Sequence, residues 1–170
     1  MTFDMAFTDD DSDVTIQRTT ITTGDASAFR LFADDATTKT ITMLLDDNSF
    51  ENASADVADD TANFSVGGGT TLNATIFDNM FTNTMGAGDE FDMAANGAAA
   101  DIQLNLSGNS ANSGGGSGNG FFDLHNTTGG TFDVFDKTNT FLNTRNDGDV
   151  TRDPNDAAFG DAAAAPPTPN

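Results

Sequence analysis

Short stretches in which apolar and polar residues alternate recur along the chain. Apolar side chains at every second position are the pattern of a β-strand with one buried face. The clearest stretches cover residues 41–45, 74–77, 102–106 and 132–135. We predict one strand in each of them, and an earlier, degenerate copy of the same strand over residues 14–21.

A polar segment built around Asn follows each of the four clear strands. The segments cover residues 47–52, 78–83, 108–112 and 138–143. Their first Asn residues are Asn48, Asn79, Asn109 and Asn139, with spacings of 31, 30 and 30 residues. In the degenerate copy, Thr19 stands where the Asn is expected. Near-equal spacings of this kind indicate a structural repeat.

A second motif with the period of a strand lies between these repeats. It occurs as Phe29-Arg30-Leu31, Phe64-Ser65-Val66, Phe91-Asp92-Met93 and Phe122-Asp123-Leu124. Small or polar residues then lead to the next repeat, at 67–69, 96–98 and 127–130. Such residues permit tight turns and positive φ angles.

Two or three short strands in each period predict an all-β fold, a right-handed parallel β-helix of about five coils of roughly 30 residues. Because the coils of such a solenoid are about 4.8 Å apart, equivalent residues lie above one another. We expect one internal stack of Phe50, Phe81 and Phe141 with a gap at Ala111, and a second of Phe29, Phe64, Phe91 and Phe122. The four Asn residues should form a hydrogen-bonded ladder at a corner, where Asn also tolerates left-handed backbone. A β-sandwich is the alternative, since its short strands have comparable spacing.

The Asn-x-Phe-x-Asn segments, together with residues 117–124 and 131–134, resemble the right-handed parallel β-helix repeats of bacterial surface and secreted proteins. Autotransporter passenger domains and large adhesins are the most similar groups. The resemblance covers residues 14–150. It implies secretion to the cell surface and suggests that the chain is part of a longer array. The same fold also carries filaments, tail fibres and polysaccharide lyases, so the resemblance is specific for fold and not for function.

Composition narrows the partners that the chain can bind. The 170 residues carry a net charge of −21, and 25 of the 27 acidic residues are Asp, which favours turns over helices. Nucleic acid and anionic membrane surfaces are disfavoured because both need clustered Lys and Arg. No apolar run is long enough to predict membrane insertion. There is no Cys, and the 15 Phe residues occur without Trp or Tyr, which indicates their use as internal apolar volume.

The two ends of the chain differ from the repeats. Residues 1–13 are expected to form an acidic first coil or cap, and Thr2-Phe3-Asp4 matches Thr131-Phe132-Asp133 in the last coil. No signal peptide is visible at the start. The β-helix domain is predicted over 1–156, and the Ala- and Pro-rich residues 157–170 are predicted to be a tail.

The candidate metal site is a run of carboxylates near the start of the chain, formed by Asp9, Asp10, Asp11 and Asp13. Carboxylate oxygens are the ligands that Ca²⁺ prefers, so Ca²⁺ is the one cofactor that the sequence suggests. The run lacks the Gly and Glu positions of an EF-hand loop. Solvated turn residues are the simpler interpretation of this run and of the other Asp pairs.

No catalytic constellation is recognisable, and we do not expect an enzyme. The six basic residues do not fall into an acid–base cluster, and carboxylates one coil apart are inevitable on an acidic solenoid. His125 is the only His, and the sequence suggests no partner for it. With no Cys and no second His, a structural zinc site is not expected.

The sequence therefore favours an extracellular or cell-surface structural module. Its role would be adhesive, or it would assemble into filaments or arrays by head-to-tail stacking of β-helix ends, because exposed ends of a solenoid invite stacking. The expected partners are other copies, further coils of a longer chain, or surface glycans. The alternative is a carbohydrate-binding or polysaccharide-degrading β-helix.

Overall fold

Every element of secondary structure in the described part of the chain is a β-strand. The computed structural model describes residues 2–8, 10–24, 26–33, 36–54, 59–84, 88–113, 122–126, 129–137, 139–141, 144–148 and 151–152. These residues include no helix that is long and apolar enough to cross a membrane. Asp9 and the predicted tail, residues 157–170, lie outside the described residues.

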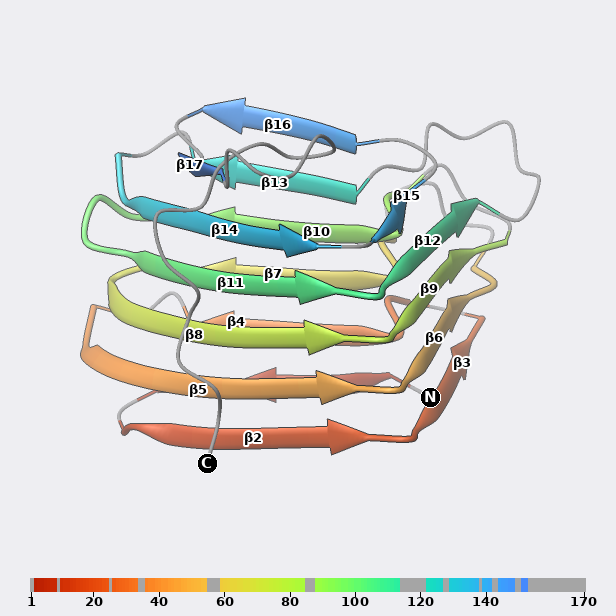
Figure 1. Cartoon of the computed structure of the whole chain (residues 1–170). Coiled ribbons are helices and arrows are strands. Elements are labelled where there is room, and N and C mark those ends of the chain that lie inside the picture. Colours follow the sequence, from red (N-terminus) through yellow and green to blue (C-terminus); the bar gives the residue numbers. More distant parts are fainter. Residues whose placement is uncertain are drawn as a thin grey trace.

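The strands form three parallel sheets that wind around one axis (Figure 1). Sheet A contains β1 (Phe3–Ala6), β4 (Phe29–Ala33), β7 (Ala62–Val66), β10 (Phe91–Ala95), β13 (Phe122–Asn126) and β16 (Thr144–Gly148). Sheet B contains β2 (Ser12–Gln17), β5 (Thr38–Asp46), β8 (Gly69–Phe77), β11 (Asp101–Ser107), β14 (Thr131–Lys137) and β17 (Thr151–Arg152). Sheet C contains β3 (Thr20–Thr23), β6 (Ser49–Asn52), β9 (Met80–Asn83), β12 (Ser110–Ser113) and β15 (Thr140–Phe141).

The chain passes from sheet B to sheet C and then to sheet A before it starts the next coil, and it climbs as a right-handed solenoid (Figure 1). The predicted parallel β-helix is therefore confirmed. The number of turns is about four, slightly fewer than the five predicted.

The interior is filled by side chains that alternate along each strand. In β5, Ile41, Met43 and Leu45 are fully buried, and in β8 the residues in register with them, Leu72, Ala74 and Ile76, are also fully buried. Strict alternation and parallel register together place apolar residues over apolar residues from coil to coil. One thin core therefore runs along the whole axis, as the low apolar content requires.

The predicted Asn ladder is present at the corner between sheets B and C. Asn48 Nδ2 donates to Asn79 Oδ1 at 2.9 Å, Asn79 Nδ2 to Asn109 Oδ1 at 3.0 Å, and Asn109 Nδ2 to Asn139 Oδ1 at 2.9 Å. Each Oδ1 also accepts the backbone N–H of the preceding Asn in the ladder. Thr19 takes the first position, as predicted, and its backbone N–H donates to Asn48 Oδ1 at 3.0 Å.

From the sequence, the Asn is expected to be the left-handed residue at this corner. In the structure, the left-handed residue is the one before the Asn. The positive φ angles are 49° at Arg18, 54° at Asp47, 51° at Asp78 and 71° at Gly108. This position turns the chain from sheet B into sheet C, which leaves the following Asn free to point into the ladder. Asp and Gly adopt this conformation at low cost, whereas Arg18 is the unusual occupant.

The Phe50–Phe81 stack is confirmed, with ring centroids 5.4 Å apart and an interplanar angle of 14°. Ala111 lies in register with Phe81 and with Phe141, so the predicted gap is also correct. The second predicted stack is wrong at one position, because Phe64 lies in register with Leu31 and Met93, and Ala62 takes the expected place. The Phe64 ring still lies 5.1 Å from Phe29 and 5.0 Å from Phe91, since small Ala62 leaves room for it.

The first strand, β1, belongs to sheet A and not to the sheet that its resemblance to residues 131–133 suggests. Phe3 pairs with Phe29, and its ring stacks on the Phe29 ring at 5.9 Å. Thr131, Phe132 and Asp133 instead lie in β14 of sheet B. The match that indicates the position of β1 is therefore that of Phe3-Asp4-Met5 with Phe91-Asp92-Met93. These two segments lie in register with each other through the strands between them in sheet A.

The turn before β14 depends on a residue without a side chain. A Cβ atom at Gly130 would lie 2.6 Å from Ala100 O and 2.7 Å from Gly97 O, both fixed backbone atoms of the preceding coil. We expect Gly130→Ala to lower the free energy of unfolding by about 1–3 kcal/mol, as overpacking does elsewhere. Gly24→Ala is the control, because nothing lies within 4 Å of its Cβ position. Urea titrations of both variants measure the difference, and equal midpoints would contradict the prediction.

Candidate functional site

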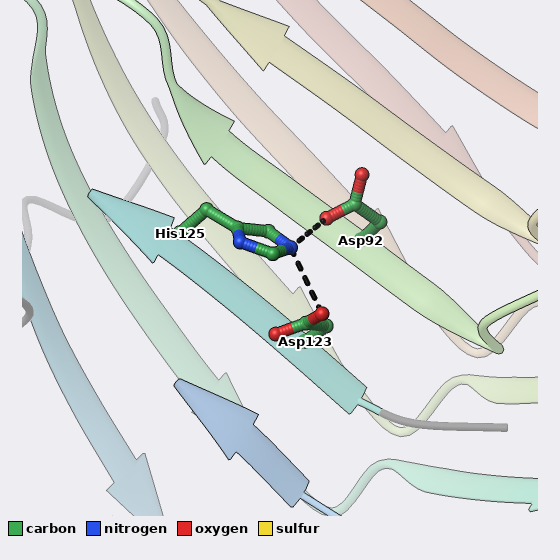
Figure 2. A group of neighbouring side chains, drawn as sticks. All are labelled: Asp92, Asp123 and His125. Atoms are coloured by element: carbon green, nitrogen blue, oxygen red, sulfur yellow. Dashed lines mark ion pairs between the residues drawn. The ribbon is translucent and has the colours of Figure 1, made fainter. Parts of the chain in front are cut away.

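Two Asp side chains and the single His meet on the outer face of sheet A (Figure 2). His125 Nε2 lies 2.8 Å from Asp123 Oδ2 and 3.2 Å from Asp92 Oδ1. The side chain of Asp123 is fully buried, whereas the side chains of Asp92 and His125 are 20% and 27% exposed. Two carboxylates and one imidazole are thus held in contact across two neighbouring coils.

The Phe-x-apolar motif of sheet A places these three residues. In β10 and β13, Phe91 pairs with Phe122 and Met93 with Leu124, and this register fixes the inner face. Asp92 and Asp123 lie between those residues and therefore share the outer face, directly opposite each other. His125 is two residues beyond Asp123, so it projects from the same face of β13.

The cluster continues into the preceding coil through an amide. Asn63 of β7 is in register with Asp92, and its Nδ2 donates to Asp92 Oδ2 at 3.2 Å and to Asp60 Oδ2 at 2.8 Å. Asp60 Oδ1 in turn accepts the backbone N–H of Asp89 at 2.9 Å. We call the connected side chains Asp60, Asn63, Asp92, Asp123 and His125 the sheet A cluster.

The surroundings of this cluster favour protonated carboxyl groups. Burial, and after it the charge of Asp60, raise the pKa of Asp92 to about 7, and His125 partly opposes this rise. Burial also raises the pKa of Glu90 to about 7 and the pKa of Asp60 above its usual range. Carboxyl groups on this side of the solenoid therefore gain and lose protons near neutral pH, whereas most carboxyl groups are ionised there.

The three residues in Figure 2 also have the geometry to hold a metal ion. One ligand atom from each of Asp92, Asp123 and His125 lies within 4.8 Å of the other two. One nitrogen and two oxygen ligands suit Zn²⁺ or Mn²⁺ better than Ca²⁺, which prefers oxygen alone. Two nearby carboxyl groups and an imidazole can equally take up and release protons.

The predicted metal ligands near the start of the chain are arranged differently. Asp10, Asp11 and Asp13 are exposed, and Asp11 Oδ1 accepts the backbone N–H of Thr40 at 2.6 Å. Asp11 and Asp13 line a shallow hollow together with Ser12, Thr40 and Thr42. Among the residues that the structure describes, these Asp side chains do not form a group of three potential metal ligands. Calcium binding at Asp9, Asp10, Asp11 and Asp13 stays a prediction.

Sequence reasoning missed the sheet A cluster. His125 was expected to have no evident partner, yet it contacts two carboxylates. The signal was present in the motifs Phe91-Asp92-Met93 and Phe122-Asp123-Leu124, in which each Asp stands between two inward residues. Once coils are stacked on these motifs, Asp92 and Asp123 must be neighbours, with His125 two residues along the same face.

A second distinctive region is the end of the solenoid formed by β1, β2 and β3, the first-coil end. Ile16 of β2 is buried, but five other inward apolar side chains of this end are only partly buried, although equivalent residues in later coils are fully buried. These side chains are Phe3, Met5, Phe7, Val14 and Ile21. The thin core is therefore open to solvent at this end in the part of the chain that the structure describes.

Comparison with known proteins adds no relative to this picture. The chain matches no protein family model, no curated protein and no solved structure.

Proposed function

We propose that the chain is a structural module of an extracellular or cell-surface assembly, without a catalytic role, and that it joins other coils through the first-coil end. The observation that carries the proposal is the set of partly exposed inward side chains at that end. Apolar surface open to water at the end of a core is the surface that a further coil would cover. Full burial of an exposed apolar side chain contributes about 1.5–3 kcal/mol, and each of these partly buried side chains would contribute a part of that when a partner covers it.

The backbone supports the same interpretation. Strands β1, β2 and β3 each stand at the edge of a sheet. An edge strand presents a row of N–H and C=O groups that another strand can pair with. A strand that runs in the same direction continues a parallel sheet without a change of hydrogen-bond pattern, and the opposite end of a second copy offers one such strand for each of the three sheets.

Charge favours a second copy, added head-to-tail, as the partner. Residues that lie in register across the strands of sheet A form one row from Asp4 in β1 to Arg145 in β16, and this row includes Asp92 and Asp123. A coil stacked below β1 in continuous register would therefore bring the Arg145 position of one copy next to Asp4 of the other. Three of the six Lys and Arg residues, at 137, 145 and 152, lie near the C-terminal end of the solenoid, where they offset most of the charge of the four Asp residues at 133, 136, 147 and 149.

The net charge of −21 opposes association and makes it dependent on salt. Two highly acidic molecules repel at low ionic strength, and screening shortens the range of that repulsion to about 8 Å at physiological salt. We therefore expect longer assemblies as the salt concentration rises.

The test compares two neighbouring residues of β2. Val14 faces inward and is partly buried, whereas Thr15 faces outward and is exposed. In sedimentation experiments at physiological and high salt, Val14→Asn should weaken self-association by about tenfold or more, because it replaces an apolar contact with a polar one. Thr15→Asn should leave the association constant unchanged, and electron microscopy should show short rods of the unmodified protein.

A protein that stays monomeric at millimolar concentration and high salt would contradict the proposal. Equal effects of Val14→Asn and Thr15→Asn would contradict the use of the first-coil end.

Carbohydrate binding is the second candidate and has narrower support. A sugar site on the side of a solenoid usually needs an exposed aromatic ring. Among the described residues, Phe77 is such a ring, 41% exposed, and Met80, 46% exposed, follows it at the corner. The other described Phe side chains are buried or partly buried, so they offer a sugar much less surface.

A further inference from the structure

We propose that Asp92, Asp123 and His125 bind one divalent transition-metal ion on the outer face of sheet A, with Zn²⁺ as the ion that fits best. The ion would join β10 to β13 and so tie two successive coils together. The inference concerns the wall of the solenoid and does not depend on self-association through the first-coil end.

The donor atoms have the spacing of ligands that share one ion (Figure 2). His125 Nε2 lies 2.8 Å from Asp123 Oδ2 and 3.2 Å from Asp92 Oδ1. Two neighbouring ligands that bind Zn²⁺ at its usual bond lengths are about 3.0–3.4 Å apart. The imidazole nitrogen is therefore already at such a distance from both carboxylates, and small side-chain rotations would complete the coordination.

The hydrogen bonds of the cluster leave one oxygen of Asp92 available to a cation. Asp92 Oδ2 accepts a hydrogen bond from Asn63 Nδ2 at 3.2 Å. Asp92 Oδ1 is buried as an atom, but it receives no hydrogen bond from any residue that the structure describes. A buried carboxylate oxygen without a donor is costly, and an ion held between Asp92 and His125 would remove that cost.

The second carboxylate is completely enclosed. The side chain of Asp123 has no exposed surface, and its Oδ2 faces His125. Asp92 lies directly opposite Asp123 on the neighbouring strand, so two carboxylates meet at this point of the wall. Buried charges need an opposite charge at close range, and a divalent cation between the two carboxylates would balance both of them.

The strands hold the donors in place before an ion binds. Asp92 pairs with Asp123, and His125 pairs with Ala94, two residues beyond Asp92. Asp92 is thus a diagonal neighbour of His125, within reach of a long side chain, and the small side chain of Ala94 leaves room for the ring. Donors fixed on paired strands lose little conformational freedom on binding, which favours affinity.

The donor set also indicates which ion binds. An imidazole nitrogen with two carboxylate oxygens favours Zn²⁺ over Mn²⁺ in the general order of affinities, and Ca²⁺ prefers oxygen ligands alone. Three protein donors leave a position for water, which can reach the site because the side chains of Asp92 and His125 are partly exposed. The sequence argues against a structural zinc site because it offers one His and no Cys, but here two carboxylates supply the missing donors.

The test is a calorimetric titration of the metal-free protein with Zn²⁺ at high salt, where the general attraction of cations to the acidic surface is screened. In the described part of the chain this is the one group of three potential ligands, so one Zn²⁺ per chain should bind more tightly than Mn²⁺ or Ca²⁺. His125→Gln removes a ligand and should weaken Zn²⁺ binding by about 100-fold or more, whereas Asn63→Ala removes a group that orients a ligand and should weaken it by about 10–100-fold. The matched control is Asp46→Asn, which removes a carboxylate from the outer face of sheet B and should leave the affinity unchanged.

Two measurements need no variant. Because His125 is the only His, its imidazole gives one set of NMR signals, and Zn²⁺ should shift these signals until one equivalent has been added. Zn²⁺ at about 100 times its dissociation constant should lower the unfolding equilibrium constant about 100-fold, since the folded protein alone presents the assembled site.

Imidazole signals that do not respond to Zn²⁺ would overturn the proposal. Equal effects of His125→Gln and Asp46→Asn on the affinity for Zn²⁺ would overturn it as well, because they would assign the binding to the acidic surface in general. Ca²⁺ binding as tight as that of Zn²⁺ would contradict the role of the imidazole.

Discussion

Replacement of Phe81 by Ala is expected to lower the free energy of unfolding by about 3–5 kcal/mol, as truncation of a buried aromatic ring does in other cores. The side chain of Phe81 is fully buried. Its ring centroid lies 5.4 Å from that of Phe50 and 5.3 Å from that of Phe91, so it joins the aromatic rings of sheets C and A. The thin core offers few other side chains that could fill the resulting cavity.

Phe77→Ala is the control for this prediction, because Phe77 is 41% exposed and precedes the same corner. It should cost less than about 1 kcal/mol, the usual range for a surface substitution. Urea denaturation followed by circular dichroism measures both variants. A loss below about 1 kcal/mol for Phe81→Ala would show that the internal Phe stack does not stabilise the fold.

Asn79→Ala is expected to lower the free energy of unfolding by about 2–6 kcal/mol, because it breaks the ladder at its centre. Asn79 is almost fully buried, and its Oδ1 accepts both the backbone N–H and the Nδ2 of Asn48. Its Nδ2 donates to Leu45 O at 2.9 Å. The substitution leaves the backbone N–H of Asn48 and the carbonyl of Leu45 without these partners, and each buried polar group that loses its partner costs about 1–3 kcal/mol.

Asn96→Ala serves as the comparison, since Asn96 is exposed and its Nδ2 donates to Ser65 Oγ at 2.7 Å on the surface. A cost below about 1 kcal/mol is expected there. Hydrogen exchange gives a second measurement for Asn79→Ala, because the amide of Asn48 should exchange faster. Similar stability of the two variants would mean that the ladder is incidental to the fold.

The features that the sequence predicts well are those that repeat in every coil. Equal spacing of Asn48, Asn79 and Asn109 predicts both the solenoid and its ladder, since parallel stacking places like residues over like residues. The same reasoning correctly placed Thr19 in the ladder, because position within the repeat matters more there than residue type.

The prediction is wrong where residues of the same type do not occupy the same position in the repeat. Phe64 was aligned with Phe29 and Phe91 because all three are Phe, yet its backbone is two residues out of register with them. The core keeps its apolar volume through neighbouring positions taken together and not through each position separately. The ring of Phe64 therefore fills the space that the small side chain of Ala62 leaves. Residue type alone does not report such an exchange.

The sheet A cluster was missed for a related reason. On a chain with 25 Asp residues, an Asp above another Asp carries little information by itself. What distinguishes Asp92 and Asp123 is their burial beside His125, and burial depends on neighbouring strands that the motif does not name. The proton chemistry of this side of the solenoid therefore becomes visible only in three dimensions.

The Asn ladder has a consequence for the electrical character of the molecule. All of its side-chain amides point the same way, with each Nδ2 directed at the Oδ1 of the next coil. Successive peptide groups of a strand alternate in direction, and their dipoles largely cancel. The ladder dipoles instead add and polarise one another, with the positive end toward the later coils. The solenoid is thus a rod with two electrically different poles, and rods of this kind attract pole to opposite pole when they align end to end.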